Sequence, residues 1–195
     1  VDLSQAELEF ARARAAELEV ELAGYMCANA LDLGELPADS FDVVLLMGPL
    51  YHLLELGERR RAIRQCQRIL KPGGVLCATV ITRYAPIRWA AALNPEWIVA
   101  GRELYDALLA TGRMSGPNFT DAYYAHPTEI RPLFEDAGFT TLDIIGVEGV
   151  VARLEDRVNA LDGEMWQAWV EMNYQIGKDP AMHGAADHLL YVGQK

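Results

Sequence analysis

The chain has 195 residues, of which 51% are hydrophobic and 9% aromatic, so it is long enough for one domain with a substantial core. Its 28 acidic residues outnumber its 17 basic ones, and the net charge of −11 would repel a phosphate backbone, which argues against a nucleic acid partner. No apolar run approaches the roughly 20 residues of a membrane span, and no secretion signal is recognisable. We therefore expect a single cytoplasmic domain over residues 1–195 that binds neither membranes nor nucleic acid.

The three cysteines do not suggest a metal site. Cys27, Cys66 and Cys77 lie far apart and show neither a CxxC motif nor the Cys/His spacing of a zinc site. They are typical of small core residues in a reducing compartment, and we expect no metal ligands.

The first predicted elements are the end of a buried strand, closed by Asp2, and a helix. Ser4 and Glu7 form an S-x-x-E capping box, which predicts a helix from just after Ser4 to about Glu19. The alanines of this helix suit close packing on a sheet. Residues 20–28 are a weaker strand prediction, and a turn-rich loop follows them.

Two apolar strands flank the next helix. FDVVLLMG (41–48) holds five consecutive apolar residues, which is typical of a parallel strand covered on both faces. KPGG (71–74) ends the helix, and VLCATVI (75–81) is the second strand. Strand, helix and strand in this order indicate a right-handed crossover in a parallel sheet. The helix carries apolar residues at steps of three and four: Ile63, Cys66, Ile69 and Leu70.

Residues 82–126 do not continue this alternation of strand and helix, and they are predicted to form a small helical insertion. Beyond it, Thr128 caps a helix that Gly138 ends, a strand covers residues 140–150, a long amphipathic helix covers residues 154–176, and HLLYVGQK closes the chain as a strand. The insertion is rich in aromatic residues and prolines: Tyr84, Trp89, Trp97, Tyr105, Phe119, Tyr123 and Tyr124, with Pro86, Pro95 and Pro117.

The order of these motifs resembles the class I S-adenosylmethionine-dependent methyltransferases, particularly their small-molecule members. VDLS resembles the end of their second strand, FDVVLLMGPLYHL their fourth strand and its loop, and LKPGGVLCATV the junction to their fifth strand. FEDAGF and ADHLLYVGQK resemble the elements of the closing antiparallel pair. The resemblance implies an α/β, Rossmann-like, mostly parallel sheet with helices on both faces and an antiparallel last strand.

Members of this family carry a first strand and a GxGxG turn upstream of the acidic residue, and the 195 residues contain neither. The only GG pair, Gly73-Gly74, follows a helix and precedes a strand, which is the wrong order for a cofactor loop. We therefore expect a sheet that is incomplete at the N-terminus, as in an amino-terminally truncated reading of a longer protein.

The resemblance implies a cofactor site for S-adenosylmethionine at the ends of the strands. A carboxylate there, Asp2, can accept both ribose hydroxyls, and Leu3 would lie beside the adenosine. The alternative for Asp2 is help in capping the next helix. At Asn29 and Ala30 the family commonly has an acid near the adenine amino group, and an Asn carbonyl can accept the same bond without charge.

The loop after the strand at 41–48 is predicted to form the floor and rim of the same site. Met47, Gly48, Pro49 and Leu50 would surround the methionine portion of the cofactor, because Gly48 allows close approach and Pro49 stiffens the turn.

Catalytic residues are left open. Tyr51 and His52 could face either substrate or core, and His52 is as readily structural as catalytic because its ring can satisfy a backbone carbonyl. His126, beside Pro127 at a helix start, is likewise either structural or catalytic. The aromatic insertion is either ordinary packing or a lid above the transferred methyl group that excludes water and selects a flat or apolar substrate.

The resemblance implies methyl transfer from S-adenosylmethionine to a small-molecule acceptor, a displacement that needs alignment of donor and nucleophile but no metal. Two alternatives remain: a non-catalytic binding or interaction module that kept the fold and lost the Gly-rich loop, and a nicotinamide-dependent oxidoreductase, which shares an acid after a second strand. The acceptor, any general base and the oligomeric state are not predicted.

Overall fold

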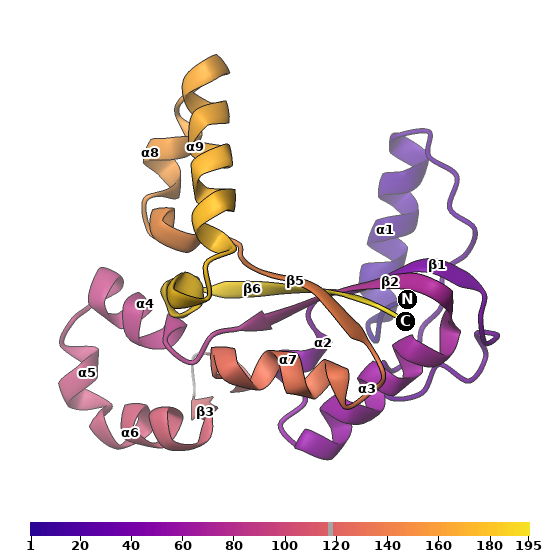
Figure 1. Cartoon of the computed structure of the whole chain (residues 1–195), viewed down its shortest axis with the longest axis horizontal. Coiled ribbons are helices and arrows are strands. Elements are labelled where there is room, and N and C mark those ends of the chain that lie inside the picture. Colours follow the sequence, from indigo (N-terminus) through magenta and orange to yellow (C-terminus); the bar gives the residue numbers. More distant parts are fainter. Residues whose placement is uncertain (117–118) are drawn as a thin grey trace.

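The computed structural model describes residues 1–116 and 119–195, and it places helices around a mixed sheet (Figure 1). The α/β class is confirmed. Pro117, one of the predicted breakers, lies outside the described residues. In chain order the elements are α1 (Gln5–Glu17), β1 (Phe41–Leu46), α2 (Pro49–His52), α3 (Leu56–Ile69), β2 (Leu70–Ile81), α4 (Ala85–Leu93), α5 (Trp97–Ala100), α6 (Arg102–Thr111), β3 (Arg113–Gly116), β4 (Phe119–Tyr123), α7 (Pro127–Glu135), β5 (Thr140–Gly146), η1 (Gly149–Val151), α8 (Glu155–Asn159), α9 (Gly163–Gly177), η2 (Pro180–Ala185) and β6 (His188–Gln194).

The main sheet has the strand order β1-β2-β6-β5. β1 and β2 are parallel and are joined through α3, which is the predicted crossover, whereas β6 runs antiparallel to both β2 and β5. The closing antiparallel pair predicted from the sequence is therefore present. Among the strands described, the far edge of β1 pairs with no other strand.

The core lies on one face of this sheet, where α3 and α7 pack. Successive side chains of a strand point to opposite faces, and on β2 the residues Leu76, Ala78 and Val80 point into the core. Phe134 of α7 stacks on Tyr191 of β6 with ring centroids 3.8 Å apart and ring planes 6° from parallel. This stack fixes α7 against the middle of the sheet.

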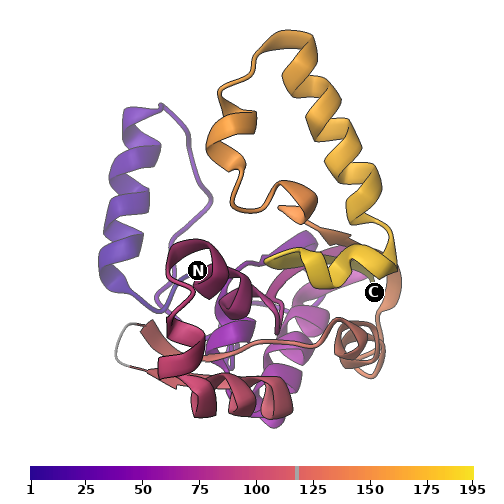
Figure 2. The ribbon, with the colours of Figure 1, turned by 90° about the vertical axis from the view of Figure 1, so that its left-hand side faces the viewer.

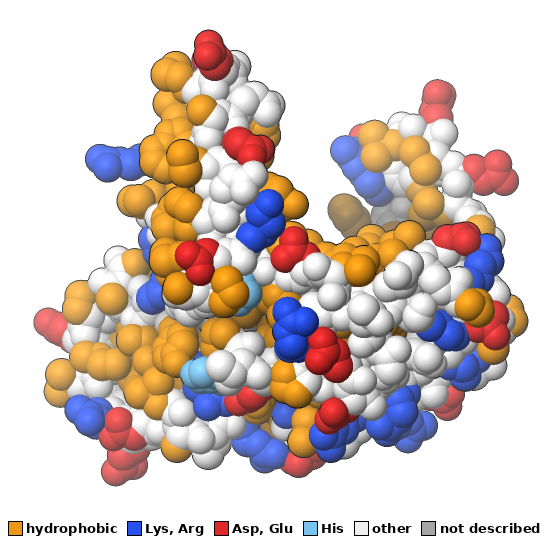
Figure 3. All heavy atoms as spheres, viewed as in Figure 1, with side chains coloured by type: hydrophobic (Ala, Val, Ile, Leu, Met, Phe, Trp, Pro, Cys, Tyr) orange, Lys and Arg blue, Asp and Glu red, His pale blue; other side chains and the backbone are white. Residues whose placement is uncertain are grey.

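The opposite face is open over β1, and the prediction that the strand at 41–48 is covered on both faces is wrong for the described chain. Val43 is 55% exposed and Leu45 is 66% exposed. Figure 3 shows hydrophobic side chains across the sheet between the two projecting parts of the molecule. A continuous apolar strand shows that both faces can be buried, but no described element packs on the second face of β1.

Two helical parts project from this open side (Figure 2). One contains α1, which buries only Leu8 and Ala15, so the predicted packing of its alanines on the sheet is wrong. The segment 20–28, predicted as a strand, makes only an isolated parallel bridge between Asp2 and Cys27. The other part contains α8 and α9.

Several predicted boundaries are corrected. β2 begins at Leu70 and includes the KPGG segment. The long helix predicted over 154–176 is two helices, because the chain turns before α9 at Gly163, whose φ of 50° favours glycine. α7 is capped by His126 in place of Thr128, since the His126 side chain accepts the backbone N–H of Thr128.

The insertion at 82–126 contains α4, α5 and α6 and also a β-hairpin of β3 and β4, which the sequence did not predict. It has a small apolar core of its own, with partly buried side chains that include Tyr51 of α2 and Trp89 of α4 packed against it. The buried members are Ile81, Ala85, Ala90, Tyr105, Leu108, Ala122 and Tyr124. None of the helices within the described ranges is long and apolar enough to cross a membrane.

Asp187, just before β6, joins the insertion to the rest of the molecule. Its side chain is 1% exposed and accepts the indole N–H of Trp89 at 2.7 Å. Arg88 of α4 lies 3.2 Å from one carboxylate oxygen, and Arg153, before α8, pairs with the other. One buried carboxylate therefore holds β6, α4 and the approach to α8 together.

We predict that Asp187→Ala lowers the free energy of unfolding by about 3 kcal/mol, because it leaves two arginines and an indole N–H without their acceptor. Chemical denaturation followed by circular dichroism measures this. Asp136→Ala is the control, since Asp136 forms an exposed ion pair with Arg60 and the change should cost less than about 1 kcal/mol. Equal losses for the two variants would contradict the role of Asp187.

A second pair fixes the start of β6. Glu148 accepts both the ring Nδ1 of His188, at 2.6 Å, and its backbone N–H, at 2.8 Å. The hydrogen bond to Glu148 raises the pKa of His188 despite burial. Burial opposes ionisation of Glu148, but the bonds from His188 outweigh it and lower the pKa of that carboxyl.

The raised pKa of His188 contributes stability that is complete below the unfolded value of about 6.5 and is lost as pH rises through the folded value. The lowered pKa of Glu148 contributes stability above its unfolded value and loses it as pH falls. We therefore expect Glu148→Gln to destabilise the chain more at about pH 6 than at about pH 9. Urea titrations at the two pH values measure the difference, and an effect independent of pH would contradict the ion pair.

Candidate functional site

The loop after β1 has the geometry expected of a close-approach turn. β1 ends at Leu46, and Gly48 follows with a φ of 116°, a conformation that side-chain-bearing residues rarely adopt. A Cβ at Gly48 would lie 3.4 Å from the Tyr51 hydroxyl oxygen. Pro49 occupies the first turn of α2, where its fixed φ suits a helix start.

The predicted residues of this loop separate into two groups. Met47 is 46% exposed, whereas Leu50 is 1% exposed and belongs to the main core. Met47, Gly48 and Pro49 are thus the part of the loop that a ligand at the strand end can reach, and Leu50 supports them from behind.

Asp2 also lies at the carboxyl end of a parallel pairing. Its backbone N–H donates to the Met26 carbonyl at 3.1 Å, and its own carbonyl accepts the N–H of Ala28 at 2.9 Å. One carboxylate oxygen accepts the N–H of Ser4 at 2.8 Å, so the capping role is present. Within the described chain the other oxygen has no hydrogen bond, and the carboxylate is exposed.

Asn29, the second predicted cofactor residue, lies two residues beyond the bridge at Cys27. Its side-chain oxygen accepts the N–H of Leu31 at 2.9 Å and so shapes the turn. Ala30 packs against the main core, and Leu3 is exposed. The structure thus gives Asn29 a local structural role and leaves Leu3 accessible.

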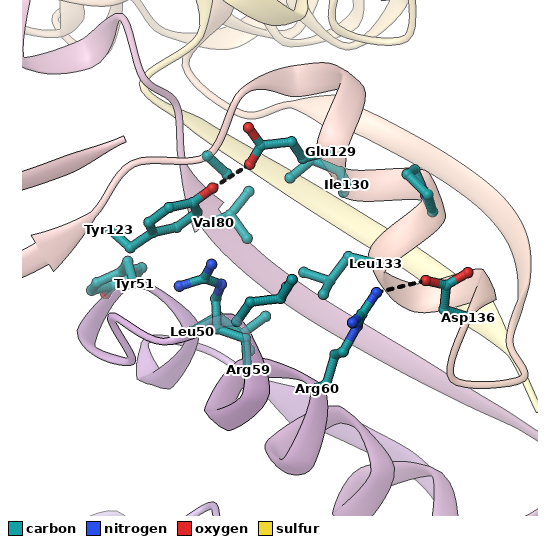
Figure 4. A pocket seen from close by; sticks show the side chains of 13 residues that line it. Leu50, Tyr51, Arg59, Arg60, Val80, Tyr123, Glu129, Ile130, Leu133 and Asp136 are labelled. Carbon is teal, nitrogen blue, oxygen red and sulfur yellow. Dashed lines mark hydrogen bonds and ion pairs between the residues drawn. The ribbon is translucent and has the colours of Figure 1, made fainter. Parts of the chain in front are cut away.

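A pocket of about 250 Å³ lies beyond this loop, between α2, α3, α7 and the strands β2 and β4 (Figure 4). Most of its wall is aliphatic, and it includes Leu50, Leu56, Val80, Ile130 and Leu133. Tyr51 and Tyr123 add aromatic rings at one end. The pocket could not be predicted from the sequence, because its walls come from five separate elements.

Arg59 of α3 is the unusual group in the pocket, because only 5% of this charged residue is exposed. Its Nη1 donates to the carbonyls of Leu53 and Leu54, at 2.6 and 2.8 Å. Its guanidinium carbon lies 3.5 Å from the centre of the Tyr123 ring, a cation–π contact. Burial lowers the pKa of Arg59, and its Nε is buried without a hydrogen-bond partner in the described chain.

The remaining polar groups of the pocket are paired. The Tyr123 hydroxyl donates to Glu129, whose other oxygen accepts Arg83 at 2.6 Å. Burial and the neighbouring Glu129 raise the pKa of Tyr123. At the mouth of the pocket, Arg60 pairs with Asp136 at 3.0 Å (Figure 4).

The three catalytic candidates from the sequence have different surroundings in the structure. His126 caps α7 and lies 2.8 Å from the Thr128 hydroxyl, so its structural reading is favoured. Tyr51 lines the pocket, and its ring lies 4.7 Å from that of His52, which is exposed. Across residues 1–116 and 119–195, no three His, Cys, Asp or Glu side chains are grouped as a metal site requires.

Sequence reasoning missed Arg59, Glu129 and Asp187. Arg59 is one of five arginines on α3, and periodicity placed them together on the face away from the core. Helical spacing nevertheless distinguishes it from the exposed Arg64, because Arg59 lies four residues before Ile63 and seven before Cys66, on the apolar stripe of the helix. Tyr123 was included only as one aromatic residue of the insertion.

Residues 1–78, which contain Asp2, Asn29 and the loop after β1, match the family model described as a methyltransferase domain. The ubiquinone biosynthesis O-methyltransferase of Coxiella burnetii (strain Dugway 5J108-111) is 27% identical over 147 residues, or 75% of this chain and 56% of that protein. Over the whole chain, the fold superimposes with a TM-score of 0.63 on an S-adenosylmethionine-dependent methyltransferase from Methanosarcina mazei. The chain is thus similar to methyltransferase domains over residues 1–78, and its fold is that of solved S-adenosylmethionine-dependent methyltransferases.

The similarity to these methyltransferases is modest. The ubiquinone biosynthesis O-methyltransferase of Caulobacter vibrioides is 31% identical over 99 residues, which is 51% of this chain and 38% of that protein. The Methanosarcina protein is 15% identical in sequence, and the match covers 79% of its chain, so this similarity supports the fold alone. The chain spans about half of the length of the Coxiella relative, because the match covers 56% of that protein.

We predict that Gly48→Ala lowers the free energy of unfolding by about 1–2 kcal/mol, because alanine is strained at a φ of 116°. Thermal and urea denaturation measure this change in the free energy of unfolding. The control is Gly57→Ala in α3, where a Cβ meets nothing within 4 Å and the helix gains up to about 1 kcal/mol. If both variants were equally stable, Gly48 would not hold a constrained turn after β1.

Proposed function

We propose that this chain is part of an enzyme that transfers a methyl group from S-adenosylmethionine to a small-molecule acceptor. The observation that carries the proposal is that Asp2, in its parallel bridge with Cys27, and Gly48, after β1, both lie in the region that matches the methyltransferase domain. In open α/β sheets, the carboxyl ends of the strands are where ligands bind.

The residues present fit the cofactor in part. The carboxylate of Asp2 keeps one oxygen without a hydrogen bond in the described structure, as a ribose ligand needs. Gly48 leaves the backbone accessible, and Met47 is exposed beside it. The fit of Asn29 is weaker, because its side-chain oxygen already accepts the N–H of Leu31.

In this proposal the chain binds the cofactor and orients it toward the acceptor. Asp2 accepts the ribose hydroxyls, Leu3 lies beside the adenosine, and Asn29 and Ala30 lie toward the adenine. Met47, Gly48 and Pro49 contact the methionine portion, and Leu50 supports them from the core. The bound cofactor supplies a methyl group already activated by the sulfonium charge. The chain therefore needs to align the acceptor and exclude water, and neither task requires a metal.

We further propose that the insertion at 82–126 acts as the lid over the acceptor. Its own apolar core gives it the rigidity that a lid needs, and Asp187 and Arg83 attach it to the sheet and to α7. Localisation in the cytoplasm is part of the proposal, since Cys27, Cys66 and Cys77 are free thiols that suit a reducing compartment. The charge of −11 supports a small-molecule partner in preference to nucleic acid.

The test is calorimetric titration with S-adenosylhomocysteine, the demethylated product. It is carried out on the 195-residue chain and on the product of the complete reading frame that contains it. We expect micromolar binding by at least one form, and we expect Asp2→Asn to weaken it about tenfold, because an amide replaces a charged hydrogen-bond acceptor. Asp162→Asn, in the loop before α9, is the control and should leave binding unchanged.

Binding should be followed by methyl transfer in a screen of O-, N- and thiol acceptors. Absence of binding by both folded forms would contradict the proposal and favour the non-catalytic module. A signal with a nicotinamide cofactor in place of S-adenosylhomocysteine would favour the oxidoreductase.

A further inference from the structure

The pocket around Arg59 has no assigned role in the cofactor site, and its charge distribution is unusual. Three cations, Arg59, Arg60 and Arg83, lie in or beside it. Arg60 pairs with Asp136, and Arg83 pairs with Glu129. In the described chain, Arg59 has no carboxylate within ion-pair distance, so the pocket keeps one unbalanced positive charge on a protein of net charge −11.

The hydrogen bonds of Arg59 are also incomplete. The carbonyls of Leu53 and Leu54 accept from Nη1, and the Tyr123 ring covers the guanidinium. These contacts hold the side chain in one orientation, in which it points toward Tyr123 in the pocket (Figure 4). The Nε atom is buried and has no acceptor among the described residues, although a buried charged donor strongly favours one.

The shape of the pocket limits the size of an occupant. A volume of about 250 Å³ is larger than the cavity of about 150 Å³ that holds benzene in a protein core, so one ring with a small substituent fits. The aliphatic wall suits the ring, and Arg59 suits an anionic substituent because charge-assisted hydrogen bonds to a carboxylate are strong.

We propose that this pocket binds a compact aromatic carboxylate, with the carboxylate on the Arg59 guanidinium and the ring against Leu50, Val80 and Leu133. Leu50 and Tyr51 come directly after Gly48 and Pro49, so the bound molecule lies next to the loop proposed to hold the cofactor. The inference goes beyond the proposed methyl transfer and does not depend on it, because binding is expected without cofactor.

The first experiment titrates benzoate and benzamide separately into the 195-residue chain, followed by heteronuclear NMR. The two probes share a ring and differ in charge. We expect benzoate to bind in the millimolar range or tighter, and benzamide to bind at least about tenfold more weakly, because it cannot form the ion pair. Equal binding of the two probes, or no shift with benzoate up to about 10 mM, would overturn the proposal.

Variants then locate the site. Arg59→Met should weaken benzoate binding at least about tenfold, whereas Arg64→Met, the same change at an exposed position of α3, should leave it unchanged. Because Arg59→Met also removes bonds to two carbonyls, Leu133→Phe provides a second test that keeps Arg59 and fills the pocket. It should weaken benzoate binding at least about fivefold. Benzoate binding unaffected by Leu133→Phe, or weakened equally by Arg64→Met, would overturn the proposal.

Discussion

The buried carboxylate of Asp187 is the interaction on which the arrangement of the molecule depends. It lies where β6 begins, and it binds Trp89 and Arg88 of α4 and Arg153 before α8. Other hydrogen bonds support the same junction, among them Thr82 Oγ1 to the Ala186 carbonyl and Arg83 to Glu129. A charge with 1% exposure is stable there only while all its partners are in place, so these three segments are held together or released together.

The open face of β1 is the second constraint. Val43 and Leu45 leave apolar side chains exposed on a strand that has a partner on only one edge, which is unfavourable for an isolated domain. The curated Coxiella relative is longer, and this chain spans 56% of it. The face is therefore where additional protein would gain most from packing.

Much of the fold could be predicted, because continuous apolar runs identify strands such as 41–46 and 75–81 whatever surrounds them. The parts that failed depend on tertiary contacts. Helical spacing places Arg59 on the apolar stripe of α3 with Ile63 and Cys66, but it cannot show that Tyr123, from a distant hairpin, covers the guanidinium. The roles proposed for Asp2 and Gly48 rest on local motifs that the sequence shares with the family it resembles. The pocket could not be predicted, because it assembles from segments 80 residues apart in sequence, from Leu50 to Ile130.

The three free thiols lie at three depths in this structure. Cys27 is exposed, Cys77 is half-buried on β2 with its side chain toward the open face of the sheet, and Cys66 is buried in the core, where desolvation raises its pKa to about 12. The rates at which a thiol reagent alkylates them therefore form an internal scale. Cys27 reports accessible surface and Cys66 reports global unfolding, while slowing of Cys77 alone would signal that something has covered the sheet. The chain thus carries its own chemical probe for contact with the open face, without any substitution.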